Sequence, residues 1–503
     1  MNDRARESGG AQGAAARVAR NTAVRGTADL VGKIFSLVLI VVLARQEGPL
    51  GVGILVFALA WGEIAAVPID MGLDRYFLRH VARDRKELDT RFFNVLTLKL
   101  VRAVPVIAGS WLLILVVSED AETRMCVFLL TASFLLDGLS LTVYAAFNAL
   151  ERAELIAASL ITQRMVSAGV GVLLLLTGSG VVAVAVAYAV ASALAFVVAM
   201  ALLARRIGMP ARQLPRGPRR DLWRRSLPFA AQELMSTGVA RIDALLLAAL
   251  ASQTVVGLYG SAYRLLEATL FVSVALQGAF VAMFTYLSER SEPSIHAVVQ
   301  RAIKLSLTLL IPWAVVLLVL AEQILELLFG ARFDAATTPL RLLALTVVPL
   351  GLSILMWTLI TSRREPRVLI LYSALVLTLN IALNLALIPP FGAEGAAAAM
   401  LGTYVVGALF MLRVSIQTVG PLQFGQTAGG PLAAGAAMAL VALALQPWLL
   451  AALPACAVVY FGVLVAIERK LAPDDLEFML GMLRRLVRSP GADSLQDEQS
   501  ERL

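Results

Sequence analysis

The stretches LARQEGPLGVGILVFA at 43–58 and LASQTVVGLYGSAYR at 250–264 decide how the fold is interpreted. With one gap they share a Leu-Ala pair and a glycine, which are Leu43, Ala44 and Gly51 in the first copy and Leu250, Ala251 and Gly257 in the second. Six predicted membrane spans precede the second copy, so both copies are entered from the same side. Chance resemblance between Leu/Ala/Gly-rich helices is the alternative. The position of the copies instead predicts a parallel duplication of two six-helix lobes.

The composition of the chain requires a membrane. Of its 503 residues, 59% are hydrophobic and 16% are charged, whereas about a quarter of the residues in ordinary soluble domains are charged. The mean hydropathy is +0.81 over the whole length, so apolar segments recur throughout the chain. Because a helix needs about 20 apolar residues to cross a bilayer, the polar and Pro/Gly breaks predict an all-α polytopic membrane protein with about fourteen transmembrane helices.

The predicted spans form two lobes and a C-terminal pair. In the N-terminal lobe (22–204) they are expected near 22–44, 50–71, 94–117, 124–149, 154–178 and 181–204. In the C-terminal lobe (226–417) they are expected near 226–250, 256–287, 298–320, 336–361, 366–388 and 394–417. Two extra transmembrane helices, near 429–447 and 449–468, lie within 418–470. The other parts are a polar N-terminus at 1–21, a basic linker at 205–225 and a tail at 471–503.

Basic residues predict which side of the membrane each loop faces. They cluster in alternate loops, most densely in RRIGMPARQLPRGPRR at 205–220, whereas the other loops are short or acidic, as in SEDAE at 118–122. Under the positive-inside rule, we expect both termini and the linker of this multi-pass protein to be cytoplasmic. The apolar run at 34–44 is expected to be a retained span, because no small-residue cleavage site of a signal peptide follows it.

Several kinds of function lack the residues that they need. Cys126 and Cys456 lie in spans far apart in sequence and predict neither a disulfide framework nor a metal site. The only histidines, His80 and His296, are too few for His-based zinc sites or Ser-His-Asp catalysis, and no P-loop motif is present. The net charge of +8 resides in loops between spans, so it forms no groove for nucleic acid. We expect no enzyme activity, cofactor, metal or nucleic-acid partner.

Four longer stretches carry a family resemblance that extends over about residues 21–416. They are LARQEGPLGVGILVFALAWGEIAAVPIDMGLDRYFLRHVAR at 43–83, LPFAAQELMSTGVARIDALLLAALASQTVVGLYGSAYRL at 227–265, FGARFDAATTPLRLLAL at 329–345 and LNIALNLALIPPFGAEGAAAAMLGTYVVGAL at 379–409. In order, spacing and span count the chain resembles the polysaccharide transporter, or oligosaccharide flippase, family, whose superfamily also contains lipid II flippases and multidrug exporters. It departs from the family pattern at Gln46-Glu47, where a Leu is common, and at AMF (282–284), where many relatives carry a proline.

The resemblance implies a flippase that moves a lipid-linked oligosaccharide, such as a polyprenyl-pyrophosphate-linked repeat unit of O-antigen, capsule or exopolysaccharide, by alternating access. Its expected partners are that substrate, membrane lipids and, as further candidates, other polysaccharide-assembly proteins. The alternatives are a multidrug or toxin exporter, a lipid II flippase and, from another class, a membrane polysaccharide polymerase or lipid-linked glycosyltransferase. Such enzymes commonly use a large external loop, and the longest outside connection expected here is about 321–338.

Ionisable residues inside predicted spans indicate the candidate site, because burying them in a membrane is costly. Charged or polar residues repeat every four positions in two stripes, which are Arg25, Asp29 and Lys33 in span one and Glu233, Thr237 and Arg241 in span seven. We expect the stripes to line a shared cavity. An anionic headgroup needs cations and its sugars need hydrogen-bond partners. The expected substrate-binding residues are therefore Arg25, Lys33, Arg241, Arg264, Gln232, Asn380 and Asn384, and the expected ion-coupling residues are Asp29, Glu233, Asp243 and Glu267.

The alternative interpretation of these charges is structural. Asp29 then pairs with Arg25 or Lys33, and Arg264 pairs with Glu267, as helix ion pairs that neutralise one another. Other polar residues in or near the spans are given structural roles, as interhelical contacts for Asp137, Gln163 and Arg164 and as interfacial anchors for Asp70 and Arg75.

Overall fold

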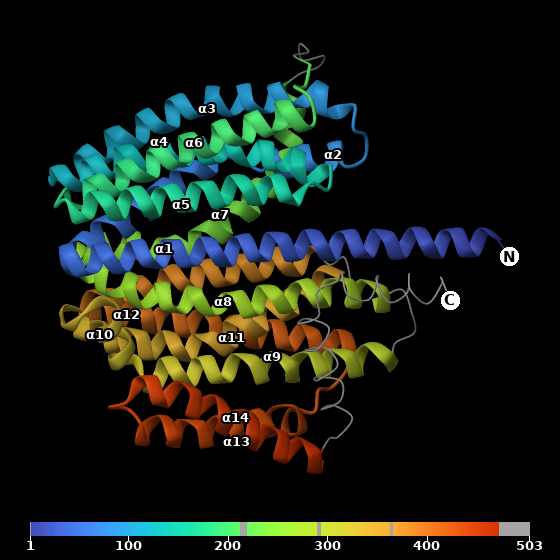
Figure 1. Cartoon of the computed structure of the whole chain (residues 1–503), viewed down its shortest axis with the longest axis vertical. Coiled ribbons are helices and arrows are strands. Elements are labelled where there is room, and N and C mark those ends of the chain that lie inside the picture. The colour runs from blue at the N-terminus through green and yellow to red at the C-terminus, as the bar shows by residue number, and fades with distance from the viewer. Residues whose placement is uncertain (1, 212–218, 289–292, 363–365, 472–503) are drawn as a thin grey trace, which may run out of the picture.

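The computed structural model describes residues 2–211, 219–288, 293–362 and 366–471. Within these ranges the chain forms fourteen α-helices and one 3-10 helix, η1 (Ala331–Ala336), and no β-strand. Most helices lie roughly along one axis, and α1 (Asn2–Asp70) projects from one end of the bundle (Figure 1). We call the end from which α1 projects the near end, and the opposite end the far end.

Two helices fold back at a glycine. α1 bends at Gly48, which has a φ of 68° and precedes Pro49, and α12 (Pro366–Val419) bends at Gly392, which has a φ of 54° and follows Pro389 and Pro390. A positive φ is a conformation that glycine adopts without steric cost. Each of these helices therefore supplies two segments of span length.

Twelve further α-helices make up the rest of the described chain, and the long ones alternate in direction between the two ends (Figure 1). The twelve are α2 (Leu73–Val81), α3 (Glu87–Val117), α4 (Ala121–Ala149), α5 (Ala153–Leu176), α6 (Gly180–Arg206), α7 (Arg219–Leu250), α8 (Gln253–Ser288), α9 (Pro293–Val319), α10 (Ala321–Phe329), α11 (Thr337–Ser362), α13 (Phe424–Ala444) and α14 (Leu449–Leu471). Only α2 and α10 are as short as nine residues. With both halves of α1 and α12 included, the described chain has fourteen segments of span length, as predicted.

Ten helices among the described residues are apolar enough to be candidate membrane spans. α7 and α8 are long enough but are not among the ten. These two helices carry Glu233, Arg241, Arg264 and Glu267 of the predicted site.

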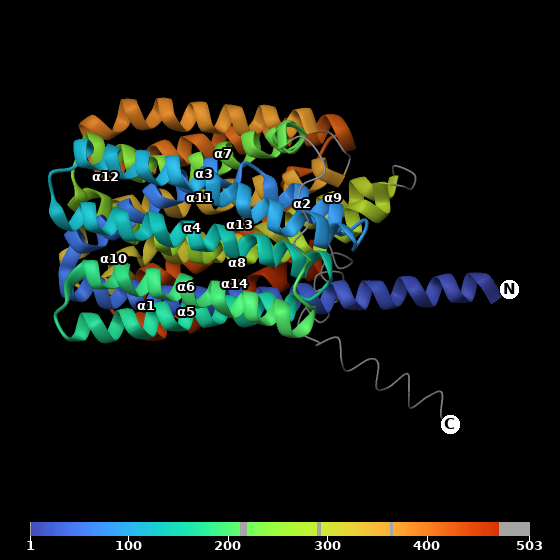
Figure 2. The ribbon, with the colours of Figure 1, turned by 90° about the horizontal axis from the view of Figure 1, so that it is seen from above.

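The helices form two lobes that meet along α1 and α8. α3–α6 lie on one side of this pair and α9 and α11 lie on the other (Figure 1), and the turned view shows the same bundle from above (Figure 2). α1 contacts α8 closely, and α7 packs against α1, α2 and α12. α13 and α14 pack together beside α9, at the outer side of the second lobe. The predicted architecture of two six-helix lobes and two additional helices is confirmed.

Small side chains allow the helices of the first lobe to approach closely. Ala187, Ala191, Ala195 and Ala199 repeat every four residues along α6 and are fully buried, where α6 packs against α4 and α5. Lipid tails are as apolar as leucine, so close packing of small residues, and not exclusion of water, holds helices together in a membrane.

Two connections are more ordered than the sequence suggested. The segment 321–338, expected to be the longest outside connection, contains α10 and η1. The segment after span two contains α2, whose Leu73, Tyr76, Phe77 and Val81 are buried against the first lobe. Short apolar runs like these bury one face only, which hydropathy averaged over a longer window does not detect. Residues 212–218 of the predicted linker and 472–503 of the predicted tail lie outside the described ranges.

Candidate functional site

The internal repeat forms the far half of the lobe interface. A Cβ atom added to Gly53 of α1 would lie 1.7 Å from the backbone oxygen of Gln253, and one added to Gly257 of α8 would lie 1.8 Å from the backbone oxygen of Pro49. This reciprocal contact relates residues 204 positions apart in the sequence. Gly257 therefore corresponds to Gly53, and the predicted match with Gly51 was two residues wrong, because a few shared letters in Gly-rich helices do not fix the alignment.

The same shift of 204 positions relates Glu63 of α1 to Glu267 of α8, and both carboxylates bind the guanidinium of Arg241 on α7. Arg241 Nε donates to Glu63, and Arg241 Nη2 lies 3.5 Å from Glu63 Oε1. Arg241 Nη1 lies 3.3 Å from Glu267 Oε1. The side chains of Arg241, Glu63 and Glu267 are 27%, 33% and 21% exposed. One partly exposed cation is thus shared by equivalent glutamates of the two lobes.

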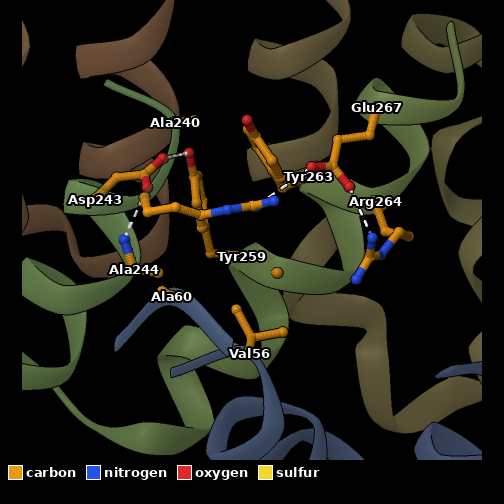
Figure 3. A pocket seen from close by; sticks show the side chains of 11 residues that line it. Val56, Ala60, Ala240, Asp243, Ala244, Tyr259, Tyr263, Arg264 and Glu267 are labelled. Carbon is orange, nitrogen blue, oxygen red and sulfur yellow. Dashed lines mark hydrogen bonds and ion pairs between the residues drawn. The ribbon is translucent and has the colours of Figure 1, made fainter. Parts of the chain in front are cut away.

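A cavity of about 30 Å³ lies beside this cluster, with room for about one water molecule. Figure 3 shows its two polar pairs, Asp243 with Tyr259 and Arg264 with Glu267. Tyr259 donates to Asp243, which is 2% exposed, and Arg264 Nη1 donates to Glu267 Oε2 at 2.9 Å. The full lining is Val56, Ala60, Ala240, Arg241, Asp243, Ala244, Tyr259, Gly260, Tyr263, Arg264 and Glu267.

The two predicted stripes converge only in part. Lys33 Nζ lies 3.5 Å from the backbone oxygen of Glu267, so Lys33 and Arg241 reach the same residue. Glu233 lies apart from them, because it pairs with Arg75 of α2 at 2.6 Å. Gln232 accepts from the same guanidinium at 3.5 Å. The side chains of Arg25 and Asp29 are outside the part of the chain that is described.

Asn380 and Asn384 do not line the cavity. They are 1% and 0% exposed, and Asn384 Nδ2 donates to the backbone oxygen of Asn380 at 2.9 Å. Asn384 Oδ1 is buried without a hydrogen-bond partner among the described residues. In this arrangement the two amides bind each other and are not presented to a sugar.

Two of the structural interpretations can now be assessed. Gln163 Nε2 donates to Asp137 at 2.6 Å between α5 and α4, which confirms the predicted interhelical contact. Asp70 and Arg75, predicted to be interfacial anchors, have partners within the protein, because Asp70 binds Lys99 at 2.7 Å and Arg75 binds Glu233 of the other lobe at 2.6 Å. Both side chains lie at a helix end, where sequence alone cannot distinguish a solvent-facing group from one facing another helix.

A second charged cluster lies inside the first lobe. Lys99 of α3 is fully buried, and its ammonium donates to Asp70 at 2.7 Å, Asp74 at 2.6 Å and the backbone oxygen of Gly138 at 2.8 Å. Thr142 of α4 donates to the other oxygen of Asp74 at 2.7 Å. Burial raises the pKa of Asp74, on α2 outside the candidate spans, to about 7, and the Lys99 ammonium opposes this shift. All three donors of Lys99 are satisfied.

Glu63 and Lys99, which belong to these two clusters, were not predicted to be functional. Both are charged residues inside predicted spans, so the rule that selected Arg25 and Arg241 applies to them equally. Glu63 has no charged neighbour at helical spacing in its own span, and its partner is on another helix. A search of the second copy 204 positions later would have paired it with Glu267.

The central cluster can bind a charged ligand by exchange. A guanidinium binds phosphate oxygens through two parallel hydrogen bonds, as it does carboxylates. Arg241 can therefore leave Glu63 or Glu267 for an anion that enters between the lobes. No group of three or more His, Cys, Asp or Glu side chains placed to hold a metal ion occurs among the described residues.

Comparison with known proteins adds a family and a fold. A family model described as "Polysaccharide biosynthesis protein" matches residues 18–289. The chain is also similar to the probable low-salt glycan biosynthesis flippase Agl15 of Haloferax volcanii, with 26% identity over 166 residues. That match covers 33% of this chain and spans only 35% of the length of the relative.

Two solved structures share the fold at low sequence identity. The lipid II flippase MurJ in an inward closed conformation is 14% identical with a TM-score of 0.75, and the match covers 89% of this chain and 99% of MurJ. An inward-facing multidrug resistance MATE transporter of the MOP superfamily is 15% identical with a TM-score of 0.64, and the match covers 79% and 98% of the two chains. These matches show that this chain shares the fold of both transporters.

Proposed function

Because this chain belongs to the polysaccharide biosynthesis protein family, we propose that it is a flippase that carries a lipid-linked oligosaccharide across the bacterial inner membrane by alternating access. The substrate is a polyprenyl-pyrophosphate-linked repeat unit of O-antigen, capsule or exopolysaccharide. Its partners are membrane lipids and other polysaccharide-assembly proteins, and both termini and the linker at 205–225 face the cytoplasm. The near end of the bundle is then the cytoplasmic end.

The observation that supports this proposal most directly is the position of Arg241. Its guanidinium lies between Glu63 of one lobe and Glu267 of the other. A pyrophosphate that leaves water loses hydration, and a fixed cation in a cavity of low dielectric replaces part of it. Binding of the headgroup to Arg241 removes the ion pair that joins the lobes, so substrate binding and lobe movement are coupled.

Further cations of the site assist Arg241. Lys33 contacts the backbone oxygen of Glu267, and Arg264 donates to its carboxylate. Arg25 lies two turns before Lys33 on α1. Gln232 is exposed enough to meet a sugar, whereas Asn380 and Asn384 act only after their mutual hydrogen bond opens. The lipid tail stays in the bilayer.

The carboxylates couple the cycle to an ion gradient in this proposal. When Arg241 moves to the headgroup, Glu63 and Glu267 lose their shared counterion, and a proton or sodium ion then compensates their charge. Asp243 and Glu233 are further candidates on α7, and Asp29 is one on α1. Exchange of the small cation resets the cluster after the substrate leaves.

The decisive experiment is complementation of a strain that lacks its own flippase for surface polysaccharide. Neutralising Arg25, Lys33 or Arg241 singly should lower transport at unchanged membrane levels of the protein. Replacing Arg25, Asp29 and Lys33 together by apolar residues of similar size should abolish transport. If this triple variant transports like wild type, the charges of the first stripe are structural.

The other functions predict different outcomes in this strain and in strains that lack those other activities. A lipid II flippase leaves surface polysaccharide absent but rescues a strain depleted of that activity. An exporter rescues neither strain and instead lowers the uptake of cationic dyes. A polymerase leaves surface polysaccharide absent, because repeat units are still not carried across, but it restores long chains in a strain that lacks its polymerase. Reporter fusions in the linker and at the C-terminus test the orientation, which is overturned by activity of a reporter that works only in the periplasm.

A further inference from the structure

Helix α2 makes charged contacts with both lobes through consecutive residues. Asp74 binds Lys99 of α3 in the first lobe, and Arg75 binds Glu233 of α7 in the second. Successive side chains of an α-helix point about 100° apart, so one turn can face two partners. This nine-residue helix at the near end therefore lies where the lobes separate or close.

The contacts of α2 with its own lobe are buried. The Lys99 ammonium is fully buried and binds Asp70 and Asp74 on either side of the start of α2. Phe77 packs against Phe92 of α3 with ring centroids 6.2 Å apart. Arg91 Nη1 donates to the Tyr76 hydroxyl at 2.7 Å. α2 consequently moves as part of the first lobe.

The contact of α2 with the other lobe is exposed. Arg75 Nη2 lies 2.6 Å from Glu233 Oε2, and the two side chains are 46% and 36% exposed. Exposed ion pairs are weak, because water and salt compete with them. A diphosphate offers more negative charge than one carboxylate and the same paired acceptors for a guanidinium. Such a ligand can therefore displace Glu233 from Arg75. It cannot displace Asp74 from Lys99, because that ion pair is buried.

We propose that Arg75 is a latch that holds the two lobes together at the near end and that a lipid diphosphate entering there releases it by taking the place of Glu233. The closing of the near end by Arg75 needs no substrate, whereas release by a diphosphate rests on the proposed function. Lys99, Asp70 and Asp74 are positioning residues that fix α2 to the first lobe. The break then occurs between the lobes and not within the first one.

The test measures distances between spin labels in the full-length protein in lipid nanodiscs. Labels are placed on cysteines in a Cys126→Ser/Cys456→Ser background. The near-end pair is Arg206→Cys with Arg367→Cys, and the far-end pair is Glu119→Cys with Asp334→Cys, all four being exposed positions. Arg75→Ala should shift the near-end distances to longer values. Each single charge reversal, Arg75→Glu or Glu233→Arg, should also shift the near-end distances to longer values. The charge swap Arg75→Glu/Glu233→Arg should restore the wild-type distribution of distances.

Arg79→Ala is the matched control, because Arg79 is an exposed arginine one turn further along α2. It should leave the near-end distances unchanged. An Arg75→Ala variant with wild-type distances would overturn the latch, and so would a charge swap that behaves like the single reversals. Restoration by the swap shows that the charge pair sets the near-end distances, and elution of each single variant at the wild-type volume in size-exclusion chromatography shows that it is folded.

The ligand part of the proposal is tested with geranylgeranyl diphosphate. Adding it to the wild type should reproduce the shift of Arg75→Ala, adding it to Arg75→Ala should give no further shift, and geranylgeraniol should give none in either. Absence of a shift in the wild type would overturn release by the headgroup. If the distances behave as expected while complementation fails, the latch stands and only the assigned oligosaccharide substrate is wrong.

Discussion

The lobe interface differs between its far end and its middle. At the far end, the backbones of α1 and α8 touch at Gly53 and Gly257, which are both buried. Arg45 also crosses there, donating to the backbone oxygen of Leu328 at 3.1 Å. In the middle, the lobes are joined by Arg241 with Glu63 and Glu267, side chains that are 21–33% exposed.

This difference shows at which part of the interface a ligand can break the contacts between the lobes. The glycine contact offers no charged group for which an anion or cation can compete, so it separates only when the lobes move as units. The ion pairs of the middle exchange partners with any ligand of suitable charge. The interface therefore combines close backbone packing at the far end with ion pairs in the middle that a charged ligand can displace.

The largest effect on transport is expected when the backbone contact between α1 and α8 is disturbed. In Gly53→Ala or Gly257→Ala the new Cβ would lie less than 2 Å from a backbone oxygen, so α1 and α8 must move apart by more than about 1 Å, since atoms in protein interiors are already close-packed. We expect transport to fall by about a hundredfold, equivalent to roughly 2.8 kcal/mol. Complementation at matched membrane levels measures it.

Gly109→Ala provides the control for this prediction, because nothing lies within 4 Å of a Cβ at Gly109. Alanine is the better helix former, so this variant should transport like wild type. Equal activity of Gly53→Ala and Gly109→Ala would mean that the far-end contact does not govern transport.

The next largest effect is expected at Arg241. Arg241→Ala leaves Glu63 and Glu267 near each other without their shared cation, and we expect transport to fall by about thirtyfold, or roughly 2 kcal/mol. Arg241→Lys keeps the charge but loses the paired hydrogen bonds, so it should retain partial activity. Full activity of Arg241→Ala would contradict a role for this cation in either the lobe contact or the headgroup site.

A smaller effect is expected from the two glutamates, and it should be unequal. Glu267 binds both Arg241 and Arg264, whereas Glu63 binds Arg241 alone among the described residues. Glu267→Gln should therefore lower transport by about tenfold and Glu63→Gln by about threefold, differences of roughly 1.4 and 0.7 kcal/mol. The same complementation assay ranks them. Equal losses would indicate that the equivalence of the two positions in the repeat matters more than Arg264.

The smallest effect is expected away from the interface. Cys126 and Cys456 are fully buried and unpaired as thiols, and Cys456 Sγ is 3.8 Å from the backbone oxygen of Met438. The double variant Cys126→Ser/Cys456→Ser should stay within about twofold of wild-type transport, because neither thiol contacts the charged cluster. A larger loss at normal membrane levels would reveal a thiol function.

The predicted spans agree with the helices because each depends on consecutive residues. The segment 121–149, for example, is mostly apolar and follows Asp120, whose side chain accepts from the backbone N–H of Thr123 at 2.7 Å. Both the span and its helical start are encoded locally. The same holds for the bend at Gly48-Pro49, where glycine followed by proline ends the first span.

The candidate site could be predicted only in part from sequence. Lys33, Arg241, Arg264 and Glu267 were selected because charges inside spans are rare, and they do meet at one place. Asn380 and Asn384 were selected by the same logic and bind each other. Polarity inside a span indicates that a side chain has a partner but does not identify that partner.

The amino-acid sequence by itself determined the number of membrane segments, their order and the duplication, since hydropathy and repeats are properties of neighbouring residues along the chain. Only the tertiary structure decided that Glu63 and Glu267 share Arg241, that Gly53 faces Gly257 and that Arg75 reaches the opposite lobe. Each of these contacts joins residues far apart in sequence. Their energies depend on distance and burial, and both are set by how the two lobes pack.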